Sequence, residues 1–287
     1  AAGMGAGLAA LSLVGCEEEE AARATPTPSP AATPTPAAAA IPIPPLKPWD
    51  PATSRGGVTR WFGYEPLPLD TVDPHQTQFG PTYSVHGAVF SKVLKYEDIF
   101  HGIMDTDLAE AMPEIVDKLT YIIKIRPNVR FHDTEKIRKN FPQVAGRQLT
   151  AEDVKYSIER QTNRSSPKAA LYYNKGHWEM IDKIEIVDPL TLRITTGRPI
   201  APFVHYLADT NAFIIAKELV DPASDEMNSA DRMIGTGPFM LDKFTALQLL
   251  SVVRNPQWFA SDDLADQGLG GRPFLDGFEA IWIPEDD

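Results

Sequence analysis

The sequence predicts an α/β fold with mixed sheets. From about residue 56 onward, short β-branched or aromatic segments that are typical of strands alternate with segments whose apolar residues recur at helical spacing. The chain has 287 residues and 43% hydrophobic content, which is enough for a sizeable core. Strands and helices in this alternation pack as helices against sheets, which gives the mixed class.

The first predicted elements are a strand, a helix and a second strand. Residues 58–64 are β-branched and aromatic between a Gly-Gly pair and a proline, which predicts a strand. Residues 81–96 place Val85 and Val89 at helical spacing behind a proline, which predicts a helix. Residues 119–125 alternate, with their odd-numbered residues all apolar, which predicts a strand with at least one buried face.

A capping pattern opens the clearest helix at Thr150. Its hydroxyl can accept the amide of Asp153, whose carboxylate can reach back, as in a capping box. Glu152 and Asp153 then lie in the first turn, where carboxylates favour the positive end of the helix dipole. We therefore expect a structural role for these two acids, not a catalytic or metal-binding one. The predicted buried face of this helix consists of Ala151, Val154, Ile158 and Gln161.

The second half of the chain predicts mostly strands. Residues 235–238, Gly-Thr-Gly-Pro, mark a turn, and we expect the glycines to permit a backbone conformation that an ordinary side chain would strain. The other predicted elements are a strand pair at 183–187 and 190–195, a short helix at 202–208, and strands at 213–216, 239–244, 247–253 and 278–283.

Charge and motif content argue against several classes of function. The formal charge of −12 disfavours a nucleic-acid partner, because phosphate binding needs a surplus of Lys and Arg. The sequence has no Gly-x-Ser-x-Gly elbow and no phosphate-binding Gly-x-x-x-x-Gly-Lys-Ser/Thr motif. We therefore expect no catalytic residue, no metal and no cofactor, and we interpret the chain as not an enzyme. The six histidines, expected to be surface or structural residues, are His75, His86, His101, His132, His177 and His205.

Residues 1–16 predict the remnant of a signal peptide that ends in a lipid-anchored cysteine. Residues 1–15 are apolar or small and no positive segment precedes them, so we expect the sequence to begin inside the signal. Residues 13–16, Leu-Val-Gly-Cys, resemble a bacterial lipoprotein lipobox, in which Cys16 carries the lipid. Each buried acyl CH₂ contributes about 0.8 kcal/mol to membrane attachment. The alternative is a hydrophobic stretch with a chance cysteine.

Residues 17–48 predict a disordered tether. Four glutamates at 17–20 precede a Thr/Pro/Ala/Ser tract at 25–48. Proline lacks a backbone donor and fixes φ, so this composition favours an extended chain without a core. At about 3.1 Å per residue such a chain reaches roughly 100 Å, which lets a folded domain find a membrane partner. The alternative is a disordered tail with no such task.

Six segments carry a family resemblance: Leu-Asp-Thr-Val-Asp-Pro-His at 69–75, Val-Phe-Ser-Lys-Val-Leu at 89–94, the run from Leu-Thr-Tyr to Arg-Phe-His-Asp at 119–133, Leu-Thr-Ala-Glu-Asp-Val with Ser157 and Arg160 at 149–160, Gly-Thr-Gly-Pro-Phe at 235–239, and Arg-Asn-Pro at 254–256. In this order they resemble the N-terminal half of the family 5 extracellular solute-binding proteins of ABC importers, the oligopeptide- and dipeptide-binding group. One departure is an insertion at 134–148, which predicts an atypical loop.

The resemblance implies a fold and a function. The fold is that of class II periplasmic-binding proteins, with a first lobe at 49–94 and 183–287, an inserted subdomain at 95–182, and the second lobe missing. The implied function is capture of a peptide-like solute at the outer face of the cytoplasmic membrane or in the periplasm. A lipid-anchored monomer would deliver it to ABC permease and ATPase subunits. An adaptor or structural lipoprotein is the alternative; a hydrolase would need a nucleophile–base pair, and the sequence offers only unpaired serines.

The resemblance also implies ligand contacts. The loop after Asp-Pro-His offers Gln78, Phe79 and Gly80, and the segment after Ser-Pro at 166–167 offers Lys168 and Tyr172. The alternative is that all five are ordinary loop residues. The family recognises the charged ends of a peptide mainly through the missing lobe, so the resemblance does not specify the solute.

Overall fold

The computed structural model describes residues 50, 54–63, 69–77 and 79–282, without the side chains of residues 62, 63 and 282. They belong to one compact unit, Pro48–Asp287. Their strands form three sheets accompanied by helices, which confirms the mixed α/β class. The predicted signal remnant, Cys16, the tether and Gln78 lie outside the described residues. No helix in the described part of the chain has both the length and the apolar character that crossing a bilayer requires.

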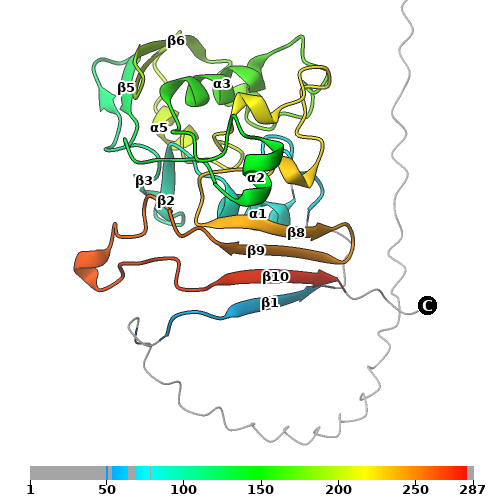
Figure 1. The fold of residues 1–287 in the computed structure, drawn as a ribbon. Helices are drawn as coiled ribbons and strands as arrows, with labels where there is room; N and C mark the ends of the chain where they lie inside the picture. Colours follow the sequence, from blue (N-terminus) through cyan, green and yellow to red (C-terminus); the bar gives the residue numbers. More distant parts are fainter. Residues whose placement is uncertain (1–49, 51–53, 64–68, 78, 283–287) are drawn as a thin grey trace, which may run out of the picture. The chain divides into compact units, whose positions relative to one another are not determined.

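The first sheet joins segments far apart in the sequence. β1 runs parallel to β10 and the other pairs are antiparallel, so the sheet is mixed as predicted. Figure 1 shows its strands as one layer in which the earliest and the latest strand lie side by side. The strands predicted here are confirmed, except that residues 247 and 248 lie in the turn before β9, where Leu247 has a φ of 59°. Residues 64 and 283 lie outside the described ranges. The strand order is β1 (Val58–Gly63), β10 (Gly277–Trp282), β9 (Leu249–Arg254) and β8 (Phe239–Thr245).

The second sheet is antiparallel throughout. Tyr121 and Ile123 are buried, as the alternation at 119–125 indicated. The predicted boundary between the inserted subdomain and the first lobe, at 182/183, falls within a strand of this sheet, and strands from both sides of it pair together. The division into lobe and subdomain stays a prediction. The strand order is β4 (Glu114–Ile115), β5 (Thr120–Lys124), β7 (Thr191–Thr196) and β6 (Ile181–Asp188).

Two helices, α2 and α3, begin at threonine caps. The Thr150 N–H donates to the Asp153 carboxylate at 2.9 Å, so the capping box is present. The Thr134 hydroxyl accepts the Ile137 N–H at 3.2 Å, so the insertion at 134–148 contains a helix and is not only a loop. The remaining elements are α1 (Gly80–Val89), the hairpin strands β2 (Leu94–Asp98) and β3 (Ile103–Thr106), α2 (Glu135–Asn140), α3 (Ala151–Thr162), α4 (Lys175–Trp178), α5 (Phe203–Tyr206), and the 3₁₀ helices Lys217–Leu219, Ala230–Arg232 and Ala265–Gln267.

The helix predicted at 81–96 is shorter than expected, and its last residues belong to β2. In a longer helix the Val89 carbonyl would accept the N–H of Val93. Instead it accepts the Gly237 N–H at 2.9 Å. The apolar spacing runs past this end because Val93 and Leu94 are buried outside any helix. The prediction was wrong because apolar spacing indicates burial, and these residues are buried without being helical.

The strand predicted at 213–216 is also wrong. Phe213 forms only an isolated bridge with Lys92. The Ile214 N–H donates to the Ser91 carbonyl at 2.9 Å, and the Ile215 N–H donates to the Ser157 hydroxyl at 3.0 Å. The segment is therefore a buried loop whose backbone bonds go to another loop and to a side chain of α3, not to a neighbouring strand.

The Gly-Thr-Gly-Pro turn packs directly on the end of α1. A Cβ at Gly235 would lie 2.0 Å from the Val89 carbonyl oxygen, and a Cβ at Gly237 would lie 2.6 Å from the Ala88 oxygen. Neither glycine has a positive φ. The expectation of an unusual backbone conformation is therefore wrong. Glycine is needed here because two backbones touch.

His132 fastens this turn to the segment after β5. Its Nδ1 accepts the Gly235 N–H at 3.2 Å, and its Nε2 lies 3.0 Å from the Gly237 carbonyl oxygen. A carbonyl only accepts, so Nε2 carries the proton and the ring is neutral. Burial lowers the pKa of His132 to about 4, although the bond to the carbonyl opposes the shift. His132 is thus a structural histidine.

We expect the protein to lose stability as the pH falls from 6.5 to about 4. In this window the unfolded chain protonates His132 while the folded chain keeps it neutral, so acid favours unfolding. A pKa difference of this size corresponds to roughly 3 kcal/mol. Chemical denaturation across this window should show a flatter profile for His132→Gln, and no such change for exposed His101→Gln. Parallel profiles for the wild type and His132→Gln would contradict this assignment.

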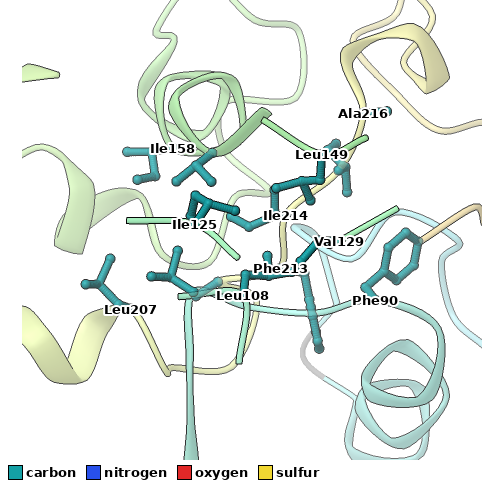
Figure 2. Packing of buried hydrophobic residues seen from close by; sticks show 14 of the residues in the cluster. Phe90, Leu108, Ile125, Val129, Leu149, Ile158, Leu207, Phe213, Ile214 and Ala216 are labelled. Atoms are coloured by element: carbon teal, nitrogen blue, oxygen red, sulfur yellow. The ribbon is translucent and has the colours of Figure 1, made fainter. Parts of the chain in front are cut away.

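The core draws on helices, strands and loops alike. Figure 2 shows Ile158 of α3, Leu207 after α5 and Phe90 after α1 among the side chains of this cluster. Phe213 and Ile214, from the loop that replaces the predicted strand, belong to the same cluster. Loop residues thus contribute to the core alongside the regular elements.

Candidate functional site

A buried ion pair joins the loop before α1 to α3. Arg160 donates from Nη1 to Asp73 Oδ1 at 3.0 Å and from Nη2 to Asp73 Oδ2 at 2.5 Å. The two side chains are 1% and 0% exposed. Burial by itself raises the pKa of Asp73, but the hydrogen bonds and the charge of Arg160 outweigh it and hold that pKa below its usual value. Both members of the pair are therefore charged.

His75 joins this pair as a neutral side chain. Its Nε2 lies 2.8 Å from the Phe213 carbonyl oxygen, so this nitrogen carries the proton. Nδ1 is left to accept from Arg160 Nη1 at 3.0 Å. Burial, followed by the charge of Arg160, lowers the pKa of His75 to about 4. The His75 carbonyl accepts the Tyr173 N–H at 3.3 Å, which ties the segment at 166–173 to the same residue.

Asp225 also bonds to Arg160. Its carboxylate accepts from Arg160 Nε at 2.9 Å and from the Tyr172 hydroxyl at 2.6 Å, and the Ser166 hydroxyl donates to it as well. Its φ of 51° lies in the left-handed region, which a non-glycine residue adopts at a cost. Burial would raise the pKa of Asp225, but the bonds from Ser166, Tyr172 and Arg160 outweigh it and lower that pKa.

Further hydrogen bonds hold the loop between Asp73 and α1. The Asn211 side-chain amide donates to the carbonyl oxygens of Pro74 at 2.7 Å and Thr77 at 3.0 Å. The Tyr83 hydroxyl donates to the Thr77 carbonyl at 3.0 Å. Together with the ion pair to Arg160, these bonds fix the loop to three separate segments. They hold residues 73–77 of this loop in place.

The structure brings two of the predicted ligand residues, Lys168 and Tyr172, to this network. Tyr172 is 4% exposed and its hydroxyl is engaged by Asp225, whereas neighbouring Tyr173 is 51% exposed. Burial raises the pKa of Tyr172, so its hydroxyl stays protonated and donates. Lys168 is partly buried and pairs with Glu226 at 2.7 Å. Of these side chains, those of Lys168 and Tyr173 are open to solvent.

Phe79 and Gly80 lie on the adjoining loop, where α1 begins. Phe79 is the N-cap residue, and its N–H donates to the Thr77 hydroxyl at 3.1 Å. Gly80 is exposed, and a Cβ added to it would meet nothing within 4 Å, so its backbone is open to approach. Gln78 lies outside the described residues. All five residues stay predicted ligand contacts.

Sequence reasoning misses Asp225 and treats Asp73 and Arg160 only as family landmarks. One signal exists for Arg160. Asp153, Ser157 and Arg160 follow one another at helical spacing beside the apolar face of α3, so the arginine is expected to be buried although it is charged. No comparable signal marks Asp225, because it lies in an irregular acidic segment that reads as a solvated turn.

The chemistry of this network is that of a hydrogen-bonded support. The Ser166 hydroxyl donates to Asp225, and the His75 ring accepts from Arg160, so these two side chains do not act on each other as nucleophile and base. Within the described ranges, no group of three or more His, Cys, Asp or Glu side chains is placed to hold a metal ion. What the network provides is two fixed loops with exposed side chains and backbone.

A separate hollow of about 410 Å³ lies beside the first turns of α3. Arg147 pairs there with Asp153 at 2.7 Å and with Glu218 at 3.1 Å, and Lys155 pairs with Glu159. These charges are thus compensated within the protein. None of the predicted ligand residues lines this hollow.

Comparison with known proteins relates this chain to one group. The family model described as "Bacterial extracellular solute-binding proteins, family 5 Middle" matches residues 104–287. Di/tripeptide-binding protein 4 of Pseudomonas aeruginosa (strain UCBPP-PA14) is 30% identical over 163 residues, which cover 53% of this chain and 30% of that protein. The Dipeptide-binding protein of Escherichia coli (strain K12) is 31% identical over 148 residues, which cover 48% of this chain and 26% of that protein.

The fold has a counterpart among solved structures. The ABC transporter-associated periplasmic binding protein DppA from Helicobacter pylori, in complex with the peptide STSA, matches with a TM-score of 0.63 at 24% identity. The match covers 81% of this chain and 44% of that chain. It confirms the predicted periplasmic-binding-protein fold for the matched part. This chain spans less than half the length of each of these relatives.

Proposed function

Because the chain belongs to family 5 of the bacterial extracellular solute-binding proteins, we propose that the protein captures a peptide-like solute outside the cytoplasmic membrane and delivers it to the permease of an ABC-type importer. The observation that carries this proposal is the family match over residues 104–287, together with relatives that are named for di- and tripeptides. On this proposal Cys16 carries the lipid anchor, residues 17–48 are the tether, and the protein acts as a monomer without catalysis.

The proposed mechanism is that of a clamp. The described residues supply one lobe, and a second lobe closes over the solute, so that contacts made only in the closed state shift the equilibrium. The backbone of Gln78, Phe79 and Gly80 would offer hydrogen bonds, and Lys168 would offer a positive charge to a carboxylate. Tyr172, the fifth proposed contact, would also hold this surface through its bond to Asp225. Loops that are fixed beforehand lose little entropy on binding, which favours affinity.

The test is binding without turnover, measured on the complete protein. Di-, tri- and oligopeptide pools should raise the melting temperature, because a ligand at 100 times its Kd stabilises by about 2.7 kcal/mol. Mass spectrometry should recover the bound peptide intact. The proposal would fail if no pool shifted the melting temperature, or if the protein hydrolysed a peptide that binds.

Two single variants separate the role of Lys168 from that of its ion pair. Lys168→Met should weaken binding of a peptide by roughly 10- to 100-fold, because a hydrogen bond to a charged group contributes about 1.5–3 kcal/mol. Glu226→Gln breaks the same 2.7 Å pair but leaves the lysine available, so affinity should hold or rise. Calorimetric titration measures both. Equal losses in the two variants would show that the ion pair matters and that Lys168 does not contact the solute.

A further inference from the structure

The turn of the β2–β3 hairpin exposes several large apolar side chains. Ile99 is 66% exposed, Phe100 94% and Ile103 51%. We call these three residues the apolar tip. One exposed apolar residue is ordinary on a protein surface, but neighbouring ones form a patch, and such patches mark interaction sites.

The apolar tip is held rigidly. The Asp98 carboxylate accepts the backbone N–H groups of Phe100 at 2.9 Å and His101 at 3.1 Å, and the His101 ring lies 2.6 Å from it. The bonds from His101 lower the pKa of Asp98, so the carboxylate stays ionised and keeps accepting. Gly102 closes the turn with a left-handed φ of 67°. Phe100 therefore projects from a fixed turn and loses little entropy when a partner covers it.

The other end of the hairpin is anchored in the core. Leu94 is fully buried, and its N–H donates to the Leu207 carbonyl at 3.2 Å. The Tyr96 ring stacks on that of His205 with centroids 6.0 Å apart, and the Tyr96 hydroxyl lies 3.2 Å from His205 Nδ1. The apolar tip is thus a fixed projection of the folded unit.

Acidic side chains flank the apolar tip. Glu97 and Asp98 precede it, and Asp105 follows it and pairs with Lys95 at 3.4 Å. An anionic membrane surface would repel this arrangement, and a second copy of the hairpin would bring like charges together. A protein surface with an apolar socket bordered by Lys or Arg side chains matches both the apolar tip and its charges.

We propose that the apolar tip docks into such a socket on a partner protein. This rests on the proposed function, under which the partner is the membrane-embedded permease of the importer. Burial of Phe100, with a rim of opposite charges around it, gives the central anchor that protein interfaces use. The proposed solute contacts at 78–80, 168 and 172 lie outside the hairpin, so docking and solute capture use separate residues.

The test uses the complete protein and permease complex reconstituted into vesicles. Phe100→Ser should weaken binding to these vesicles by about tenfold or more, with peptide affinity and melting temperature unchanged. Glu97→Lys should weaken binding too and reduce its dependence on salt. Val187→Ser removes a similarly exposed apolar side chain from β6 and should bind as the wild type does.

Each of three results would overturn the proposal. The first is that Phe100→Ser binds as tightly as the wild type. The second is that the wild type binds equally well to vesicles without permease, which would assign the apolar tip to lipid. The third is a lower melting temperature of Phe100→Ser, which would show that another part of the protein covers the apolar tip. Failure of the proposed function is distinguishable, because the wild type itself would then bind neither peptide nor permease vesicles.

Discussion

Replacing Arg160 with Met is expected to lower the free energy of unfolding by about 3–5 kcal/mol. Met retains much of the apolar stem but leaves Asp73, which has no exposed surface, without its two charged hydrogen bonds. The donors to Asp225 and to His75 disappear as well. Removing one partner leaves the other as an uncompensated buried charge, so the loss of stability exceeds what the pair itself contributes. Urea unfolding at neutral pH measures the difference.

Arg164→Met is the matched control. Arg164 follows the same helix, and it pairs with Glu179 at 3.2 Å through a side chain that is 80% exposed. Exposed pairs contribute little, so this variant should lie within about 0.5 kcal/mol of the wild type. The double variant Asp73→Asn/Arg160→Met should lose less than the sum of its single variants, because no buried charge is left alone. Equal losses in Arg160→Met and Arg164→Met would refute the buried network.

Gly235→Ala is expected to lower the free energy of unfolding by about 2–4 kcal/mol although it adds only a methyl group. The new Cβ would lie 2.0 Å from the Val89 carbonyl oxygen and 2.7 Å from its carbon. Both atoms are backbone, so no side-chain rotation relieves the clash. The turn must move away from α1, which stretches the bond between the Gly237 N–H and Val89 and the bonds of the turn to His132.

Gly87→Ala provides a control of opposite sign within α1. Gly87 is exposed, and a Cβ there would meet nothing within 4 Å. Alanine in a helix interior is favoured over glycine by about 0.5–1 kcal/mol, so this variant should be more stable than the wild type. Thermal or urea unfolding compares the two. A Gly235→Ala variant as stable as Gly87→Ala would show that the backbones do not touch at the turn.

The elements that could be predicted are those with a local signal. α3 shows a cap and a buried face within its own residues, and β5 shows alternation, so neither needs information from distant parts of the chain. The two wrong element predictions, the helix at 81–96 and the strand at 213–216, share a cause. Apolar spacing indicates which residues are buried, but it does not indicate where their backbone hydrogen bonds go. The Val89 carbonyl and the Ile215 N–H both form hydrogen bonds outside their own segments.

The candidate site could be predicted only in part for the same reason. Asp73 and Arg160 stand in recognisable motifs, but their pairing joins positions 87 residues apart, which no periodicity encodes. Lys168 and Tyr172 followed from the family resemblance. The structure adds that the Tyr172 hydroxyl is engaged by Asp225 while Tyr173 is exposed. Asp225 adopts a left-handed backbone conformation, for which the sequence contains no recognisable signal.

The parallel pairing of β1 with β10 sets the timing of assembly. Arg60 and Glu279, which meet across these strands, are 219 positions apart. A ribosome adds about 5–20 residues per second, so β1 waits roughly 10–40 s for its partner to be synthesised. Pairing over such a distance is also slow once both strands exist. During this interval the edge of β1 that pairs with β10 is unprotected.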